Sequence, residues 1–130
     1  MINEHYQIGE VAEMVGLSLR TIRYYEEIEL VSPSGRTEGG FRLYTDSDVS
    51  RLHLVKALKP VGLSLETMGE LVGAVDELGT AETADDDSAN ERVAAVLEVA
   101  YEGCDHMEER LRQARAALGE VAALVREGVR

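Results

Sequence analysis

Two arginines and a tyrosine near the beginning of the chain are spaced so that they could belong to one binding surface. Arg20, Arg23, Tyr24 and Glu27 follow one another at i, i+3, i+4 and i+7, which places them on one face of a helix. An arginine can pair with a guanine edge or a phosphate, and a tyrosine hydroxyl can reach a phosphate. The alternative is an ordinary solvated helix face, but an Arg-Tyr-Tyr run is uncommon there. The pattern therefore favours contacts with a nucleic acid.

Two short helices separated by a tight joint would hold this face in place. Apolar residues at positions 8, 11, 12 and 15 have the spacing of an amphipathic helix, and a glycine follows as a stop signal. Ser18 can cap a second helix that runs to about Glu27 and turns Ile22 and Tyr25 inward. Because only two residues separate the helical patterns, the helices must cross rather than lie antiparallel. The sequence therefore predicts a helix-turn-helix.

Turn residues and capping signals further along predict a hairpin and two more helices. One proline and three glycines precede an alternating stretch, so residues 31–44 are predicted to form a two-stranded hairpin with Phe41 as its packing anchor. Thr45 and Asp48 form a capping box for the next helix, which a proline and a glycine end. Ser64 is expected to cap a further helix. The first part of the chain is thus predicted to be mainly α.

Charge is distributed unevenly along the chain. The net charge is −12 over 130 residues, which is unusual for a protein that binds nucleic acid. Residues 18–60 nevertheless contain seven basic and six acidic residues, whereas residues 76–130 contain six basic and fourteen acidic ones. DNA affinity depends on local phosphate contacts more than on the charge of the whole chain. The charge distribution therefore permits a DNA-binding face in the first half without predicting it.

Composition excludes several classes of protein. A single cysteine excludes an internal disulfide and a multi-cysteine metal site. We find no signal peptide and no long apolar run, so we expect a soluble cytoplasmic protein that makes no membrane contact. The sequence also has no paired acids in a pocket-forming pattern, no nucleophile constellation and no phosphate-binding loop. We therefore expect neither an enzyme nor a bound cofactor or metal. Residues 79–90 are predicted to be an acidic linker, with the acids at 85–87 a surface charge run rather than a metal site.

The last third of the chain has a heptad repeat in which apolar or small residues follow steps of four and three. One row of the seam consists of Val93, Ala100, Met107, Ala114 and Val121, and the other of Leu97, Cys104, Leu111, Leu118 and Val125. A helix with this seam exposed would be unstable, so residues 91–127 are predicted to be the coiled-coil dimerisation helix of a homodimer. The alternative is a helix that folds back on its own domain, but the other helices are too short to cover so long a seam.

Cys104 has three open roles: a small apolar filler of the seam, a thiol sensor, or a metal ligand. On a helix, residues two apart point about 200° apart, so Cys104 and His106 cannot chelate one ion together. A thiol at a seam position packs as a small apolar group. We therefore favour the structural role.

Several motifs together resemble the signature of the MerR family of transcriptional regulators. They are Thr21–Glu26, Leu30-Val31, Pro33, Arg36, Gly40–Tyr44 and Asp48–Leu52, in matching order and spacing. The resemblance extends from about Tyr6 to Val72, and the heptad helix is similar to the family's dimerisation helix in type and place. It implies a winged helix-turn-helix domain with two following helices over residues 1–78, then a long coiled-coil helix.

The resemblance also implies a function. Two chains would pair through an antiparallel coiled coil and bind double-stranded DNA at a near-palindromic operator in a promoter spacer. Clamping the phosphates would distort the spacer so that RNA polymerase can read both promoter elements. The alternative is a DNA-architectural or recombination accessory protein with the same DNA-reading domain but no promoter output.

Individual roles follow from the matching positions. The expected DNA contacts are Ser18, Arg20, Arg23 and Tyr24 from the recognition helix, Arg36, Arg42 and Tyr44 from the wing, and Lys56 and Lys59 from the following helix. Metal, redox and drug sensors of the family carry additional cysteines or a ligand-binding domain. Near the position of the first metal-binding cysteine this chain has Ser88-Ala89-Asn90. We therefore expect none of the family's known sensor types.

Overall fold

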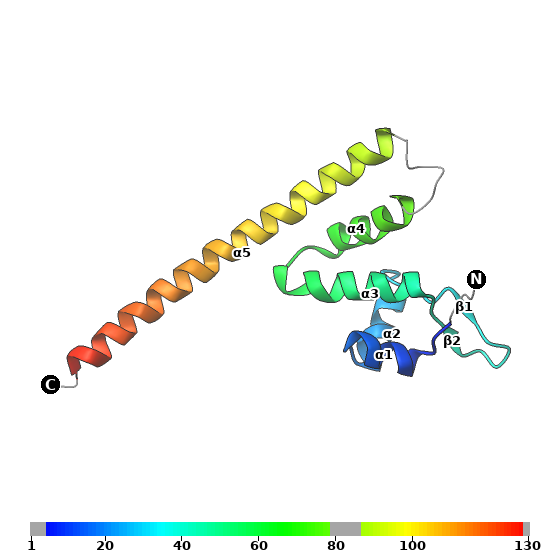
Figure 1. Ribbon diagram of the computed structural model, residues 1–130, viewed down its shortest axis with the longest axis horizontal. Helices are drawn as coiled ribbons and strands as arrows, with labels where there is room; N and C mark the ends of the chain where they lie inside the picture. Colours follow the sequence, from blue (N-terminus) through cyan, green and yellow to red (C-terminus); the bar gives the residue numbers. More distant parts are fainter. Residues whose placement is uncertain (1–4, 79–86, 129–130) are drawn as a thin grey trace.

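The helix-turn-helix forms at the beginning of the chain in the computed structural model, which describes residues 5–78 and 87–128. Helix α1 spans Ile8–Val15 and helix α2 spans Leu19–Glu27. Between them, Gly16 has a φ of 77°, a left-handed conformation that favours glycine, and its amide donates to the carbonyl of Ala12 at 2.9 Å. The predicted pair of crossing helices is confirmed (Figure 1).

A small wing follows α2. Strand β1 (Gly35–Arg36) pairs antiparallel with β2 (Arg42–Leu43), with Gly35 opposite Leu43. Just after β2, Tyr44 exchanges two backbone hydrogen bonds of 2.8 Å with Tyr6. These bonds attach the segment before α1 to the end of the wing. The predicted hairpin is confirmed, although its paired strands are only two residues long.

The two further helices also begin where the capping signals predict. Helix α3 spans Asp46–Leu58 and has the capping box of Thr45 and Asp48. A 3-10 turn, η1 (Lys59–Val61), ends it, and α4 spans Leu65–Leu78. The Ser64 hydroxyl accepts from the backbone amide of Thr67 at 3.1 Å and so caps α4.

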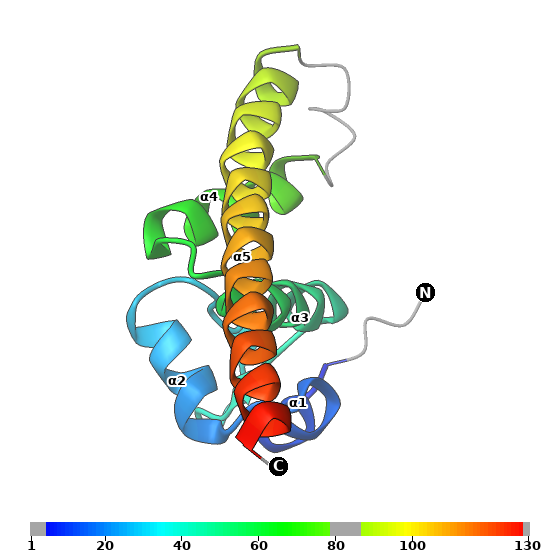
Figure 2. The ribbon, with the colours of Figure 1, turned by 90° about the vertical axis from the view of Figure 1, so that its left-hand side faces the viewer.

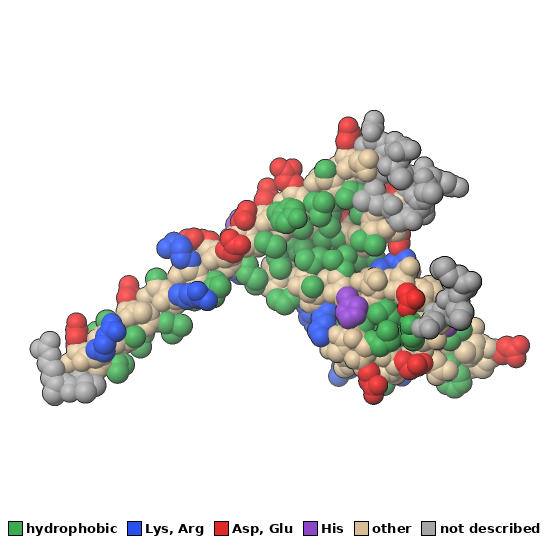
Figure 3. All heavy atoms as spheres, viewed as in Figure 1, with side chains coloured by type: hydrophobic (Ala, Val, Ile, Leu, Met, Phe, Trp, Pro, Cys, Tyr) green, Lys and Arg blue, Asp and Glu red, His purple; other side chains and the backbone are tan. Residues whose placement is uncertain are grey.

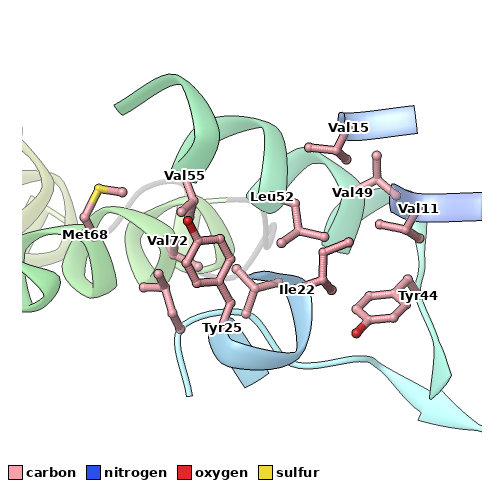
Figure 4. Close-up of a cluster of buried hydrophobic side chains, with 12 residues drawn as sticks. Val11, Val15, Ile22, Tyr25, Tyr44, Val49, Leu52, Val55, Met68 and Val72 are labelled. Atoms are coloured by element: carbon pink, nitrogen blue, oxygen red, sulfur yellow. The ribbon is translucent and has the colours of Figure 1, made fainter. Parts of the chain in front are cut away.

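One apolar core joins α1 to α4 and the end of the wing (Figure 4). Its buried members are Val11, Val15, Ile22, Tyr25, Leu30, Val31, Tyr44, Val49, Leu52, Val55, Met68 and Val72. They come from α1, α2, α3 and α4 and from the segments just before β1 and just after β2 (Figure 4). Burial of this cluster fixes the angle between α2 and the other helices and therefore the direction in which the outer face of α2 points.

Asp48 is the buried charge of this domain, and its partners explain why it is tolerated. Its carboxylate accepts from the Ser34 amide at 3.1 Å and the Ser34 hydroxyl at 2.6 Å, and it pairs with Arg51 at 2.6 Å. Arg51 also pairs with Asp76 of α4. A buried carboxylate is stable only when its oxygens are satisfied in this way. The network ties the wing, α3 and α4 together.

Helix α5 spans Asp87–Gly128 and has 42 residues, a length of about 63 Å at 1.5 Å per residue. Its first half packs against α4 and η1, and its second half extends beyond the rest of the chain (Figures 1 and 2). The helix begins four residues before the predicted boundary, so residues 87–90 are helical. The rest of the predicted linker, residues 79–86, lies outside the described residues.

Candidate nucleic-acid interface

The outer face of α2 is fixed by its cap and by its inner face. The Ser18 hydroxyl accepts from the backbone amide of Thr21 at 3.0 Å, which starts the helix as predicted. Ile22 and Tyr25 are buried, whereas Arg20, Arg23 and Tyr24 are exposed. The predicted division of this helix into an inner and an outer face is confirmed. The outer face presents two guanidinium groups and a phenol hydroxyl on a rigid element.

Both wing arginines are bound by a single carboxylate of α2. Arg36 Nη2 lies 2.9 Å from Glu26 Oε2, and Arg42 Nε donates to Glu26 Oε1. Arg36 also donates to the Gly40 carbonyl at 3.1 Å. The hydrogen bond to Glu26 raises the pKa of the Arg42 guanidinium, so its charge is retained throughout the accessible pH range. Glu26 therefore holds the wing against the helix and offsets part of its positive charge.

Glu26 belongs to the family signature, but the sequence did not predict it as a site residue. Its partners lie 10 and 16 positions further along the chain. Helical spacing predicts side-chain pairs that are three or four residues apart, so it cannot predict the pairing of Glu26 with two arginines this far along the chain. The only available signal was an acidic residue beside a basic face.

Tyr44 corrects a prediction. The sequence resemblance placed it among the DNA contacts, but its side chain is 0% exposed and lies in the core beside Val11 (Figure 4). The backbone bridge to Tyr6 turns the residue inward, and its hydroxyl has no hydrogen-bond partner among the described residues. Burial raises the pKa of this phenol above its usual 10.0. Tyr44 supports the wing from inside.

Phe41 corrects a second prediction. It was expected to anchor the hairpin, yet its side chain is 65% exposed. The turn before it is closed by hydrogen bonds between the backbones of Thr37 and Phe41 at 2.8 Å and of Gly40 and Thr37 at 2.9 Å. Those bonds hold the turn without help from the ring. The wing thus carries an exposed aromatic side chain.

The two lysines of the predicted site lie in different surroundings. Lys56 donates to the Val15 carbonyl at 2.8 Å and thereby caps the end of α1. A side chain at Gly16 would come within 2.6 Å of its ammonium nitrogen, which is a second reason for glycine there. Lys59 lines the same cavity as Arg20 and Tyr24. The fold therefore brings Lys59 beside the outer face of α2 and uses Lys56 to join α3 to α1.

The predicted dimerisation residues divide into two groups. In the first half of α5, Ala100 is buried, and Val93, Cys104 and Met107 are partly buried, where the helix packs against its own chain. Leu97 and all the remaining members are exposed: Leu111, Ala114, Leu118, Val121 and Val125. Figure 3 shows apolar side chains gathered over α4 and α5 and continuing along α5. Part of the seam in the first half of α5 therefore packs against the same chain, which was the alternative to dimerisation. The rest of the seam is exposed.

The described residues offer neither a metal site nor a membrane-spanning helix. Within residues 5–78 and 87–128, no group of three or more His, Cys, Asp and Glu side chains could hold a metal ion. None of the helices described there is long and apolar enough to cross a membrane.

Two crossing helices, a short hairpin and a long helix with an open apolar face define the chain as a winged helix-turn-helix protein with a protruding helical arm. Residues 6–74 match the profile of the MerR HTH family regulatory proteins. The chain belongs to this family.

Relatives and solved structures agree with this assignment. The chain is 48% identical over 67 residues to the HTH-type transcriptional regulator ZntR of Escherichia coli K12, covering 52% of this chain and 48% of that protein. It is 41% identical over 71 residues to the mercuric resistance operon regulatory protein of Bacillus cereus, covering 55% and 54%. The chain thus matches about half the length of these curated relatives.

The likeness to one solved structure extends over nearly the whole chain. That structure is HiNmlR, described as a MerR family regulator lacking the sensor domain, bound to promoter DNA. The TM-score is 0.73 at 25% identity, and the match covers 95% of this chain and 92% of that one. The likeness therefore includes most of the long helix.

Proposed function

We propose that this chain is a DNA-binding transcription regulator that works as a homodimer on a near-palindromic operator within a promoter spacer. The observation that carries the proposal is the outer face of α2, where Arg20, Arg23 and Tyr24 project from a helix held by buried Ile22 and Tyr25. Such a face fits the major groove, where arginines pair with guanine edges and tyrosines with phosphates. The relation to HiNmlR, a protein solved on promoter DNA, supports the same use.

The wing and Lys59 would add contacts to the DNA backbone. Arg36 and Arg42 lie on the hairpin next to α2, and Lys59 lies at the far end of α3. Contacts on both sides of the recognition helix would clamp the duplex over a longer stretch than the helix alone. Clamping of this kind stabilises a bent or undertwisted duplex, which would allow RNA polymerase to engage both promoter elements.

A second copy of the chain would cover the open face of α5. Leu111, Leu118 and Val125 are all more than half exposed, and no other helix or strand among the described residues covers them (Figure 1). Contiguous apolar surface of this kind marks a protein interface. Antiparallel pairing of two α5 helices would bury these residues and place two recognition helices on one duplex.

The test of DNA recognition compares two variants on DNA recovered by genomic crosslinking. Arg23→Ala is expected to lose about 1–3 kcal/mol of binding free energy, about 5- to 150-fold in affinity, because a base-edge contact is lost. Arg115→Ala, an exposed cation on α5, is the matched control and should bind like wild type. Equal affinity of wild type and Arg23→Ala would refute the recognition-helix assignment. Recovered sites scattered without promoters would favour the architectural function.

A further inference from the structure

A cavity opens beneath the outer face of α2, between α2, α3, η1 and the first turn of α4. Its volume is about 330 Å³, and its apolar wall includes Leu30, Val55, Leu63 and Met68. Val55 and Met68 belong to the core and are only 1% and 5% exposed. Small-molecule sites occupy roughly 300–1,000 Å³, so this cavity suits a small ligand.

A phenol group lines the cavity without an intramolecular partner among the described residues. Tyr25 is 4% exposed, and its phenol points toward Val55 (Figure 4). Within the described part of the chain its hydroxyl takes part in no hydrogen bond. A phenol hydroxyl can both donate and accept a hydrogen bond, so this one is available to a polar group of a ligand in the cavity.

The polar lining is cationic. Arg20 and Lys59 both line the cavity and are exposed, and neither forms an ion pair with a described residue. Tyr24 adds a second phenol, and no carboxylate is among the lining residues. A ligand that fits this arrangement has an apolar body and one anionic group. A planar carboxylate matches the fork of a guanidinium.

We propose that this cavity binds a small hydrophobic monocarboxylate, with its chain against Val55 and Met68 and its carboxylate between Arg20 and Lys59. The consequence for regulation rests on the proposed function: the same two cations face the DNA. A bound carboxylate would neutralise them and place a negative charge near the phosphates. Ligand and DNA would therefore compete, and the ligand would weaken operator binding. This gives the chain an effector site within the DNA-binding domain itself.

The first experiment titrates the full-length, isotope-labelled protein with octanoate in the absence of DNA. Octanoate should shift the methyl resonances of Val55, Leu63 and Met68 and leave those of Leu118 and Val125 unchanged. The uncharged analogue 1-octanol should bind more weakly, because it cannot pair with the cations. Shifts confined to Leu118 and Val125, or no shifts at all, would overturn the proposal.

Variants separate the two parts of the site. Lys59→Gln should weaken octanoate about threefold, as expected for an exposed ion pair, and leave 1-octanol binding unchanged. Arg115→Gln, which removes a cation from α5, should bind octanoate like wild type. Leu65→Trp enlarges an exposed side chain at the cavity and should block it, with thermal unfolding confirming that the variant folds. Undiminished octanoate binding by folded Leu65→Trp would contradict the site.

The competition is measured on the DNA recovered by crosslinking. Saturating octanoate should lower the DNA affinity of wild type and leave that of Leu65→Trp unchanged. If octanoate binds in the cavity but DNA affinity is unaffected in both, the competition is wrong. If wild type does not bind the DNA even without octanoate, the proposed function fails, whereas the DNA-free titration still decides whether the cavity binds the carboxylate.

Discussion

At the scale of single residues, one buried and one partly buried side chain control the position of the wing. The Tyr44 ring fills the core under the hairpin, and the Glu26 carboxylate joins Arg36 and Arg42. The first fixes where the wing begins, and the second limits how far its arginines can turn. Both act on the candidate interface without being part of its outer surface.

Tyr44→Phe tests the corrected role of this residue. Removal of a buried hydroxyl that has no partner should leave stability unchanged or raise the free energy of unfolding by about 1 kcal/mol. DNA affinity should stay close to that of wild type because the ring does not reach the surface. Chemical denaturation and a DNA-binding titration measure the two quantities. A large loss of DNA affinity with unchanged stability would mean that Tyr44 contacts DNA after all.

The phenol of Tyr44 also gives a pH dependence. Its pKa is raised in the folded protein, so folding favours the protonated form. This contribution to stability is fully present below about pH 10, the unfolded value, and is lost as the pH rises through the folded pKa. The unfolding free energy of wild type should therefore fall more steeply above pH 10 than that of Tyr44→Phe. Parallel curves for the two proteins would contradict the burial effect.

Glu26→Gln tests the carboxylate that joins the wing to α2. With the charge removed, Arg36 and Arg42 are free to pair with phosphates. The slope of log K against log salt should become steeper by about 0.9, the value for one additional phosphate contact. Binding to unrelated DNA should tighten. Titrations at several salt concentrations measure the slope, and Glu13→Gln, an exposed acid on α1, controls for overall charge. An unchanged slope would contradict the prediction, because it would mean that Glu26 does not limit the phosphate contacts of Arg36 and Arg42.

At the scale of elements, the contact between α5 and the turn after α3 connects the arm to the DNA-binding domain. Gly103 permits this contact, because a side chain there would lie 2.7 Å from Leu63 Cδ2 and 3.1 Å from Val61 Cγ1. Leu63 also lines the cavity beneath α2. The arm, the turn and the cavity therefore share one side chain, so a shift of α5 would change the shape of the cavity.

A pair of glycine substitutions within α5 tests this contact. Gly103→Ala should lower the free energy of unfolding by about 1 kcal/mol, because overpacking outweighs the gain in helix propensity. Gly119→Ala, where an added side chain meets nothing within 4 Å, should raise it by about 1 kcal/mol. Denaturation at one fixed protein concentration compares them, since dimerisation contributes to stability. Equal stabilisation by both substitutions would show that α5 does not pack closely on the turn.

At the scale of the whole molecule, the second half of α5 has an apolar face that the described part of the chain leaves uncovered. Leu118 and Val125 are exposed by 67% and 61% on an arm that extends away from the domain (Figure 1). A lone helix with this surface gains little from local propensity and needs packing to remain stable. The proposed homodimer supplies that packing.

Leu118→Glu tests the assembly. A charge in the centre of the open face should convert a dimer into a monomer at micromolar concentration, since a buried unpaired carboxylate is unfavourable. Ala116→Glu adds the same charge two residues away, off the heptad rows, and should remain dimeric. Sedimentation equilibrium gives the mass of each. A monomeric wild type would refute the dimer.

Local signals determined most of the secondary structure in this protein. The caps at Ser18, Thr45 and Ser64 act within three residues of themselves, so the starts of α2, α3 and α4 are readable from the sequence. The division of α2 into buried and exposed faces follows from helical spacing in the same way. These features depend on neighbours in the chain and hold regardless of what packs against them.

Only the tertiary structure decided which distant residues meet. The burial of Tyr44 depends on its pairing with Tyr6, and the role of Glu26 depends on where the wing lies. The cavity lies where residues of α2, α3, η1 and the first turn of α4 come together around the turn at residues 59–61. The heptad seam of α5 was visible in the sequence, but which part of it packs on α4 was not. Long-range contacts such as these are set by the joint packing of the core, which no local spacing encodes.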